Sequence, residues 1–256
     1  PQAGDGAVKM YRNVAKVVLK GIKIKESVAE GQQYPNAELK LKEIFILHGH
    51  NNSKLVGANG AEWGSTMMDG SYGNGVVSDA YTKYLEDVTE TDKIFNYIQD
   101  PTSNYVYEPT FVSVFDDVTV SKTEAYAPKD MKTFYPYENT SGEDGIQTLL
   151  VIKGDFSYDG IKSGDSEPSR ITESNRYYSF AIGNTGTVSE KVPTDFVGLR
   201  ADDKIHGVMR NLQYNTTITV TGPGYKTPVG PKYDETFLDV KVEVVPFGEV
   251  DQDVEI

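Results

Sequence analysis

The C-terminal end of the chain constrains its fold most strongly, because it holds two strand patterns separated by a proline. In the first pattern, apolar Leu238, Val240, Val242 and Val244 alternate with charged residues. That alternation, rich in β-branched side chains, is typical of a strand with one buried face. Pro246 cannot donate a hydrogen bond to a sheet ladder, so we expect regular pairing to end or switch there.

A second short apolar run follows the proline and closes the chain. Val250, Val254 and Ile256 fall on one face of this run, and acidic residues fall on the other. Chain ends fray unless something holds them, so an apolar end with a strand pattern needs a partner. The pattern fits two interpretations: an ordinary last strand of the same domain, or a strand donated to a neighbouring molecule.

The composition is that of a folded protein with room for a sizeable core. The chain has 256 residues, of which 38% are hydrophobic and 25% are charged, enough for one large or two smaller domains. Its formal net charge of -13 repels phosphate backbones, so we expect no nucleic-acid partner. Cysteine is absent, which excludes disulfides, thiol catalysis and cysteine-ligated zinc.

The first residues have neither a basic segment nor an initiator methionine. The chain opens with Pro1, Gln2 and Ala3, which predicts a processed or truncated product whose export signal has been removed. No apolar run approaches the length needed to span a membrane.

Strand patterns separated by turns recur along the chain and predict an all-β fold of two sandwich domains. The point most like a linker lies at Pro128, so we expect an N-terminal domain at 1–128, a C-terminal domain at 129–246 and a tail at 247–256. A Gly-rich segment around Trp63 is expected to be a surface excursion. That excursion spans residues 48–81, and a polar loop is expected at 162–174. The expected strands are residues 14–24 with a bulge at Gly21, 39–47, 93–99, 105–114, 134–139, 148–154, 176–182, 205–220 and 238–244.

No set of residues forms a recognisable catalytic motif. His48 and His50 alternate, which would place both imidazoles on one strand face and suit a metal, but the sequence supplies no third ligand. His206 stands alone. We therefore expect no enzyme activity, no cofactor and no metal site.

Four tyrosines lie within expected strands. Tyr135, Tyr137, Tyr177 and Tyr178 could form a platform on which a sugar stacks. Their alternation within strands favours packing in the core or between sheets.

Four motifs follow one another in the second half of the chain. They are 134–139 (Phe-Tyr-Pro-Tyr-Glu-Asn), 148–154 (Thr-Leu-Leu-Val-Ile-Lys-Gly), 176–178 (Arg-Tyr-Tyr) and 208–214 (Val-Met-Arg-Asn-Leu-Gln-Tyr). In this set and order, with a weaker match at 12–17, the chain resembles the fimbrillins of Bacteroidales, the subunits of type V pili. Pro136, and Phe247 where the family often has Trp, depart modestly from the pattern.

The resemblance implies two transthyretin-like β-sandwich domains and a structural pilin subunit of a cell-surface fimbria that supports adhesion. Such subunits are exported to the outer membrane as lipoprotein precursors, and a trypsin-like protease then removes an N-terminal strand. The C-terminal strand of the next subunit fills the groove that is left, giving a head-to-tail polymer joined to anchor and tip subunits. A trypsin-like enzyme cuts poorly before proline, so Pro1 fits the cleavage point poorly.

This interpretation assigns the polymerisation contacts to the tail and to the first two strands. The expected donor side chains are Phe247 as anchor, Val250, Val254 and Ile256. The expected acceptor groove is lined by Val14, Val17, Leu19, Ile22, Ile24, Leu39, Leu41, Ile44 and Ile46.

Three other functions stay open on the sequence. A tip or accessory adhesin of the same family would bind a host glycan or protein through the Gly-rich excursion around Trp63. A secreted hydrolase built on a β-sandwich would need an essential carboxylate, and the sequence nominates none. A pilin of the Gram-positive type would carry Lys–Asn isopeptide bonds, each of which lowers the intact mass by one ammonia.

Overall fold

The computed structural model of the chain is all-β in the part that it describes. The described residues are 12, 14–25, 34–47, 49, 110–127, 132–139, 147–183, 207–226 and 238–247. Their strands are β1 (Lys16–Ile24), β2 (Glu38–Leu47), β3 (Thr110–Ser121), β4 (Thr133–Phe134), β5 (Leu149–Gly160), β6 (Ser169–Ala181), β7 (Leu212–Val220) and β8 (Leu238–Pro246). Within these ranges no helix is long and apolar enough to cross a membrane.

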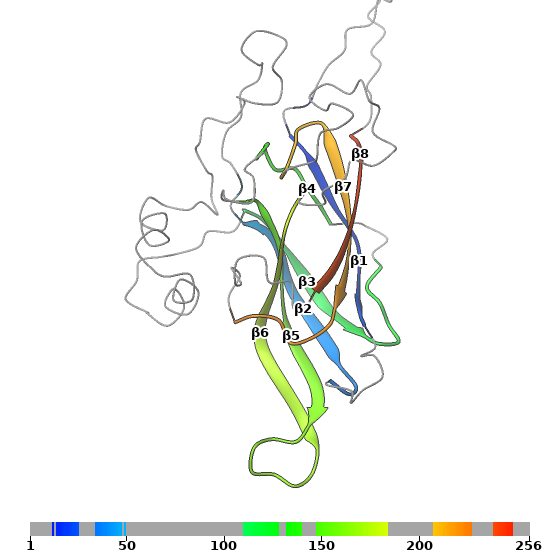
Figure 1. Cartoon of the computed structure of the whole chain (residues 1–256), viewed down its shortest axis with the longest axis vertical. Helices are drawn as coiled ribbons and strands as arrows, with labels where there is room; N and C mark the ends of the chain where they lie inside the picture. The colour runs from blue at the N-terminus through cyan, green and yellow to red at the C-terminus, as the bar shows by residue number, and fades with distance from the viewer. Residues whose placement is uncertain are drawn as a thin grey trace, which may run out of the picture.

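Two four-stranded sheets form a β-sandwich (Figure 1). One sheet has the strand order β4-β1-β7-β8, and the other has the order β3-β2-β5-β6. Neighbouring strands are antiparallel except for β1 and β7, which run parallel. Since a parallel pair needs a long connection, the chain builds the whole second sheet before it returns to β7 beside β1.

Strands from both sides of residue 128 share each sheet. β1 pairs with β4 and β7, and β2 pairs with β3 and β5. The described strands therefore form one sandwich with members from both sides of residue 128, and the division of the whole chain at that residue stays a prediction. The backbone partners of β1 and β2 lie far along the chain, and a local change in composition carries no record of that pairing.

The core lies between the sheets and takes side chains from alternate strand positions. β1 supplies Val17 and Leu19 before the bulge, and Ile22 and Ile24 after it. A register shift between Leu19 and Gly21 keeps both pairs on the inner face, which confirms the bulge expected at Gly21. In β7 alternate residues are all buried: Leu212, Tyr214, Thr216, Ile218 and Val220.

The structure confirms the strands expected at 14–24, 39–47, 148–154, 205–220 and 238–244, with ends shifted by several residues. β3 begins and ends later than the strand expected at 105–114. The strand expected at 93–99 and the excursion at 48–81 lie almost wholly outside the described residues, with Gly49 as the exception.

Two expectations need correction. β6 begins at Ser169, inside the loop predicted at 162–174, because β5 and β6 continue past the sandwich as a two-stranded arm (Figure 1). Much of that arm faces solvent, so its residues are polar at successive positions and the alternation disappears. β4 covers only Thr133–Phe134 instead of 134–139. Beyond it Pro136 has no N–H for a ladder, and pairing reduces to isolated bridges at Tyr137 and Asn139.

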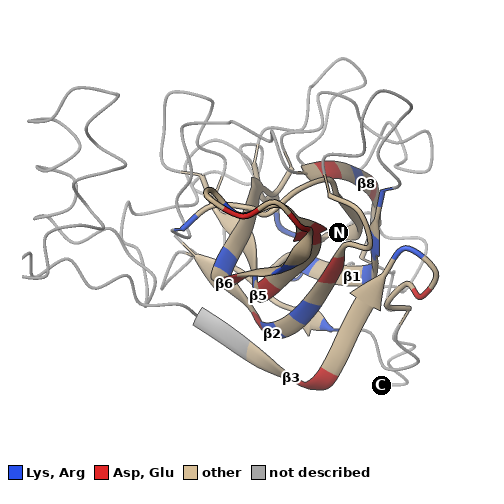
Figure 2. Cartoon of the chain, turned by 90° about the horizontal axis from the view of Figure 1, so that it is seen from below, with Lys and Arg blue, Asp and Glu red and all other residues tan. Residues whose placement is uncertain are grey.

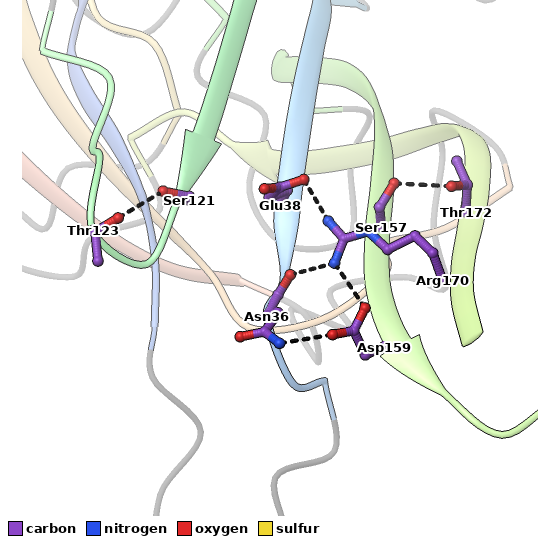
Figure 3. A network of polar contacts seen from close by, with 8 residues as sticks. All are labelled: Asn36, Glu38, Ser121, Thr123, Ser157, Asp159, Arg170 and Thr172. Atoms are coloured by element: carbon purple, nitrogen blue, oxygen red, sulfur yellow. Dashed lines mark hydrogen bonds and ion pairs between the residues drawn. The ribbon is translucent and has the colours of Figure 1, made fainter. Parts of the chain in front are cut away.

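Arg170 ties the arm to the start of β2 (Figure 3). Its Nη1 donates to Asn36 O at 2.6 Å and to Asp159 Oδ1 at 3.2 Å, while its Nη2 donates to Glu38. Asn36 Nδ2 in turn donates to Asp159 Oδ2 at 2.7 Å. Groups this exposed add little stability, so the network orients the arm more than it holds the fold together.

Basic and acidic residues both occur along β2 and β5 (Figure 2). The ion pairs are Lys40–Asp117 at 2.9 Å, Lys42–Asp155 at 2.6 Å and Lys153–Glu43 at 3.5 Å. They join neighbouring strands of the sheet and leave the inner face to apolar side chains.

Gly183, just after β6, provides a test of the packing. It has a φ of +79°, and a Cβ at this position would lie 1.7 Å from Gly207 O. We expect Gly183→Ala to lower the free energy of unfolding by about 3 kcal/mol or more. The positive φ is unfavourable for alanine, and the added Cβ would clash with Gly207 O. The matched control is Gly164→Ala, where φ is +96° but nothing lies within 4 Å, with an expected loss of about 1 kcal/mol. Urea unfolding measures both, and equal losses would contradict the contact.

Candidate interface at the last strand and the base of the tail

β8 lies at the edge of its sheet, with β7 on one side. The pairing runs without a register shift from Leu238 opposite Val220 to Pro246 opposite Leu212. Among the described residues no other strand pairs with the outer edge of β8. The strand ends at Pro246, as the sequence predicted.

The outer edge of β8 presents backbone groups that β7 does not use. Phe247 N donates to Asn211 O at 2.9 Å, which sets the alternation of this antiparallel ladder. Counted back along the unbroken register, Val240, Val242 and Val244 direct their N–H and C=O groups away from β7. Such an edge is a template for another strand.

The side chains of the same valines face the core. Val244 is buried, whereas Val240 and Val242 are only partly buried against the core. Asp239 and Lys241 point to solvent on the other face. The edge of β8 thus combines backbone groups with incompletely covered apolar surface, and an added strand would cover both.

Phe247, the first residue beyond β8, is held on several sides. Its ring stacks on Tyr135, with centroids 5.9 Å apart and an angle of 24° between the planes. The guanidinium carbon of Arg12 lies 4.4 Å from the Phe247 ring centroid, and Lys16 Nζ lies 5.4 Å from it. Arg12 Nη1 also donates to Phe247 O at 2.6 Å. We call Arg12, Lys16, Tyr135 and Asn211 the Phe247 socket.

The structure describes one of the four residues predicted as donors. Phe247 was expected to anchor the tail, and in the structure it attaches the tail to its own sandwich. Val250, Val254 and Ile256 lie outside the described residues, so their role stays a prediction.

The residues predicted to line the acceptor groove face the core of the sandwich. Val14 is half-buried, and the other eight are at most 8% exposed. The eight belong to β1 and β2 and pack against the opposite sheet. Their role in a groove stays a prediction, and an incoming strand would reach them only by replacing a strand that covers them.

The socket residues were missed by sequence reasoning. Arg12 and Phe247 are separated by 235 positions, and a cation beside an aromatic ring leaves no periodic signal. Tyr135 was considered only as part of a sugar platform. That platform does not form as a unit, because Tyr135 is 45% exposed while Tyr177 and Tyr178 are at most 9% exposed. The packing interpretation is confirmed for Tyr177 and Tyr178.

A buried ion pair lies beside the socket. Arg210 Nε is 3.5 Å from Glu138 Oε2, and the backbone N–H of Arg210 donates to the same oxygen at 3.1 Å. Glu138 is 1% exposed and its Oε1 has no hydrogen-bond partner. Burial raises the pKa of Glu138 above its ordinary value, and the N–H bond and charge of Arg210 only partly oppose that rise.

Lys42, Asp155 and Asn175 have the side chains that an isopeptide bond requires. Lys42 Nζ lies 2.6 Å from Asp155 Oδ1 and 3.0 Å from Asn175 Oδ1. Burial alone would raise the pKa of Asp155, but hydrogen bonds from Lys42 and from Asn175 N–H lower it below its ordinary value. The carboxyl group therefore stays ionised and cannot donate a proton to the amide of an exposed Asn175.

The described residues contain no group of three or more His, Asp or Glu that could hold a metal ion. His48, His50 and His206 lie outside these residues, so the prediction of no metal site at the histidines stays a prediction.

No family model matches the chain, and no curated protein matches it. Among solved structures, a "putative cell adhesion protein" from Parabacteroides distasonis ATCC 8503 is 27% identical, with a TM-score of 0.50 over 93% of this chain and 60% of that one. A fimbrilin from Porphyromonas gingivalis W83 is 18% identical, with a TM-score of 0.49 over 94% of this chain and 60% of that one.

A second protein described like the first, from Bacteroides eggerthii DSM 20697, is 15% identical with a TM-score of 0.41, over 93% of this chain and 57% of that one. The chain thus spans about three fifths of the length of these proteins. Of the three likenesses, that to the Parabacteroides distasonis protein supports an argument about this chain, because the TM-scores of the other two lie below 0.5.

Glu138 predicts a specific pH dependence of stability. Because its pKa is raised in the folded state, its favourable contribution is complete below the ordinary glutamate pKa and is lost as pH rises through the raised value. In Glu138→Gln this loss should vanish, leaving an offset from the lost ion pair with Arg210 that does not vary with pH. Wild type should lose up to about 1.4 kcal/mol per pH unit relative to the variant within that window. Urea unfolding between pH 4 and pH 8 measures the free energy of unfolding of both proteins. A constant difference between wild type and Glu138→Gln over that range would contradict the prediction.

The ionised Asp155 in the Lys42–Asp155–Asn175 cluster predicts that no isopeptide bond forms there. The intact mass of the purified chain should equal its sequence mass. A mass lower by one ammonia, restored in Lys42→Arg, would place a bond at this cluster and favour the Gram-positive pilin interpretation.

Proposed function

We propose that the chain is a structural subunit of a cell-surface fimbria, which polymerises head to tail by strand donation and so supports adhesion. The observation that carries the proposal is the outer edge of β8, where backbone groups and half-covered valines lie open beside the point at which the tail begins. The likeness to the Parabacteroides distasonis protein, described as a cell adhesion protein, supports the adhesive role.

The tail has the properties that a donated strand needs. In a strand its apolar Val250, Val254 and Ile256 would share one face, and its acidic residues would share the other. Each main-chain hydrogen bond that it makes to a neighbour contributes about 1 kcal/mol net, and each buried valine or isoleucine adds about 1.5–3 kcal/mol before ordering costs. A contact between unlike surfaces that does not close on itself produces a filament.

Two sites could accept the tail of a neighbouring molecule. One is the outer edge of β8, and the other is the predicted groove lined by core residues of β1 and β2, which opens once a covering strand leaves. In the proposed pathway a trypsin-like protease removes that strand from an exported lipoprotein precursor. Anchor and tip subunits would then end the filament at the cell surface and at its far end.

Electron microscopy of the purified chain under assembly conditions tests the proposal. The full chain should form filaments, and a chain lacking residues 248–256 but keeping Phe247 should stay folded and form none, because it lacks the donor. Filaments from both chains would show that the donor lies elsewhere. Stable monomers from both would overturn polymerisation and favour the second candidate.

Val242→Pro distinguishes the two acceptors. The N–H of Val242 points away from β7, so proline there should leave the β7 ladder intact while removing an edge donor. If the edge is the acceptor, Val242→Pro should assemble at least about tenfold more slowly than Val242→Ala, which keeps the N–H. Equal rates would assign the donor strand to the groove of β1 and β2.

The second candidate is a tip or accessory adhesin that binds a host glycan or protein. The description of the Parabacteroides distasonis protein favours it, because that description names adhesion and not assembly. Monomers that bind host cells without forming filaments would support it.

A further inference from the structure

The Phe247 socket lies where four strand ends of one sheet meet. β1 begins at Lys16 and β7 at Leu212, while β4 ends at Phe134 and β8 at Pro246. Their registers place these ends side by side. The socket residues come from the ends of the other three strands of the sheet. Asn211 immediately precedes β7, Arg12 and Lys16 lie before and at the start of β1, and Tyr135 immediately follows β4.

β8 is an edge strand of this sheet, so a load on its end can peel it away. It has one hydrogen-bonded neighbour, and its C-terminal end continues directly into the tail. A load applied through the tail reaches the ladder at the pair of Val245 and Gln213. From there the cross-strand bonds can break one at a time, because each is nearly perpendicular to the strand.

We propose that the Phe247 socket is a latch that keeps β8 from peeling off β7 when the tail is loaded. Phe247 is the first residue of the tail, so its contacts must break before a load reaches the pair of Val245 and Gln213. Those contacts spread the load onto β1 and β4 as well as β7. The latch rests on the proposed function only for the source of the load, which is the neighbouring subunit in a filament.

Arg12 is the residue that fixes both the ring and the backbone of Phe247. Its guanidinium lies over the ring and donates to the carbonyl oxygen of the same residue. The planar fork allows both contacts at once, which an ammonium group does less well. Tyr135 covers the ring by stacking, so the ring is held by its faces, and an aliphatic side chain could not replace it.

Hydrogen exchange of the full chain as a monomer tests the latch without any filament. In Phe247→Leu, which keeps apolar bulk but removes the ring, the amides of Val245 and residue 247 should exchange about tenfold faster. Arg12→Gln should have the same effect. Tyr135→Phe keeps the stacked ring and should leave exchange unchanged. The amide of Ile152 in β5, far from the socket, reports on the fold as a whole.

Two results would overturn the latch: wild-type exchange at residues 245 and 247 in both loss variants, or an equal acceleration at Ile152, which would indicate general destabilisation. A second measurement pulls the full chain through its C-terminus, and Phe247→Leu should open at a lower force than wild type. The same force in both would also overturn it.

The two proposals fail separately. Exchange as expected in a chain that never forms filaments would keep the latch and overturn polymerisation. Normal filaments from a Phe247→Leu chain with wild-type exchange would keep polymerisation and overturn the latch.

Discussion

The parallel pairing of β1 with β7 is the contact on which the rest of the sandwich depends. It joins residues near the start of the chain to residues almost 200 positions later, through the backbone ladder and through Thr216 Oγ1, which donates to Val18 O at 3.0 Å. It also gives β1 two neighbours, so the inner-face residues of β1 can lie at the centre of the core. Because the strands run in the same direction, both begin at the same end of the sheet.

That shared end determines how the tail leaves the sandwich. β8 runs antiparallel to β7 and therefore finishes where β1 and β7 begin. Phe247 then meets Arg12, Lys16 and Tyr135 without any long loop to bring them together. The same arrangement leaves β8 at the edge of the sheet, where two of its own valines are only partly buried. One geometry thus supplies both a firm base for the tail and an open edge for another strand.

The sequence predicted the features that depend on neighbouring residues and missed those that depend on residues far apart along the chain. Alternation in β1, β2, β7 and β8 was visible because it repeats every two residues, and the bulge at Gly21 was visible as a break in that repeat. For part of the β5–β6 arm the sequence predicted a loop, because exposure to solvent removes the alternation of apolar and polar residues. The pairing of β1 and β2 with strands beyond residue 128 was not predicted, because the sequence near a strand does not specify its partner. The Phe247 socket was missed for the same reason.

By itself the sequence determined that the chain is all-β, where most described strands lie, which of their side chains face inward, and that pairing stops at Pro246. These are properties of a short stretch of backbone and its side chains. Only the tertiary structure decided that β1 lies beside β7, that β8 has an open edge, and that Phe247 is held by Arg12 and Tyr135. Those contacts join residues more than 100 positions apart, and their free energy depends on the closed sandwich, which no local pattern contains.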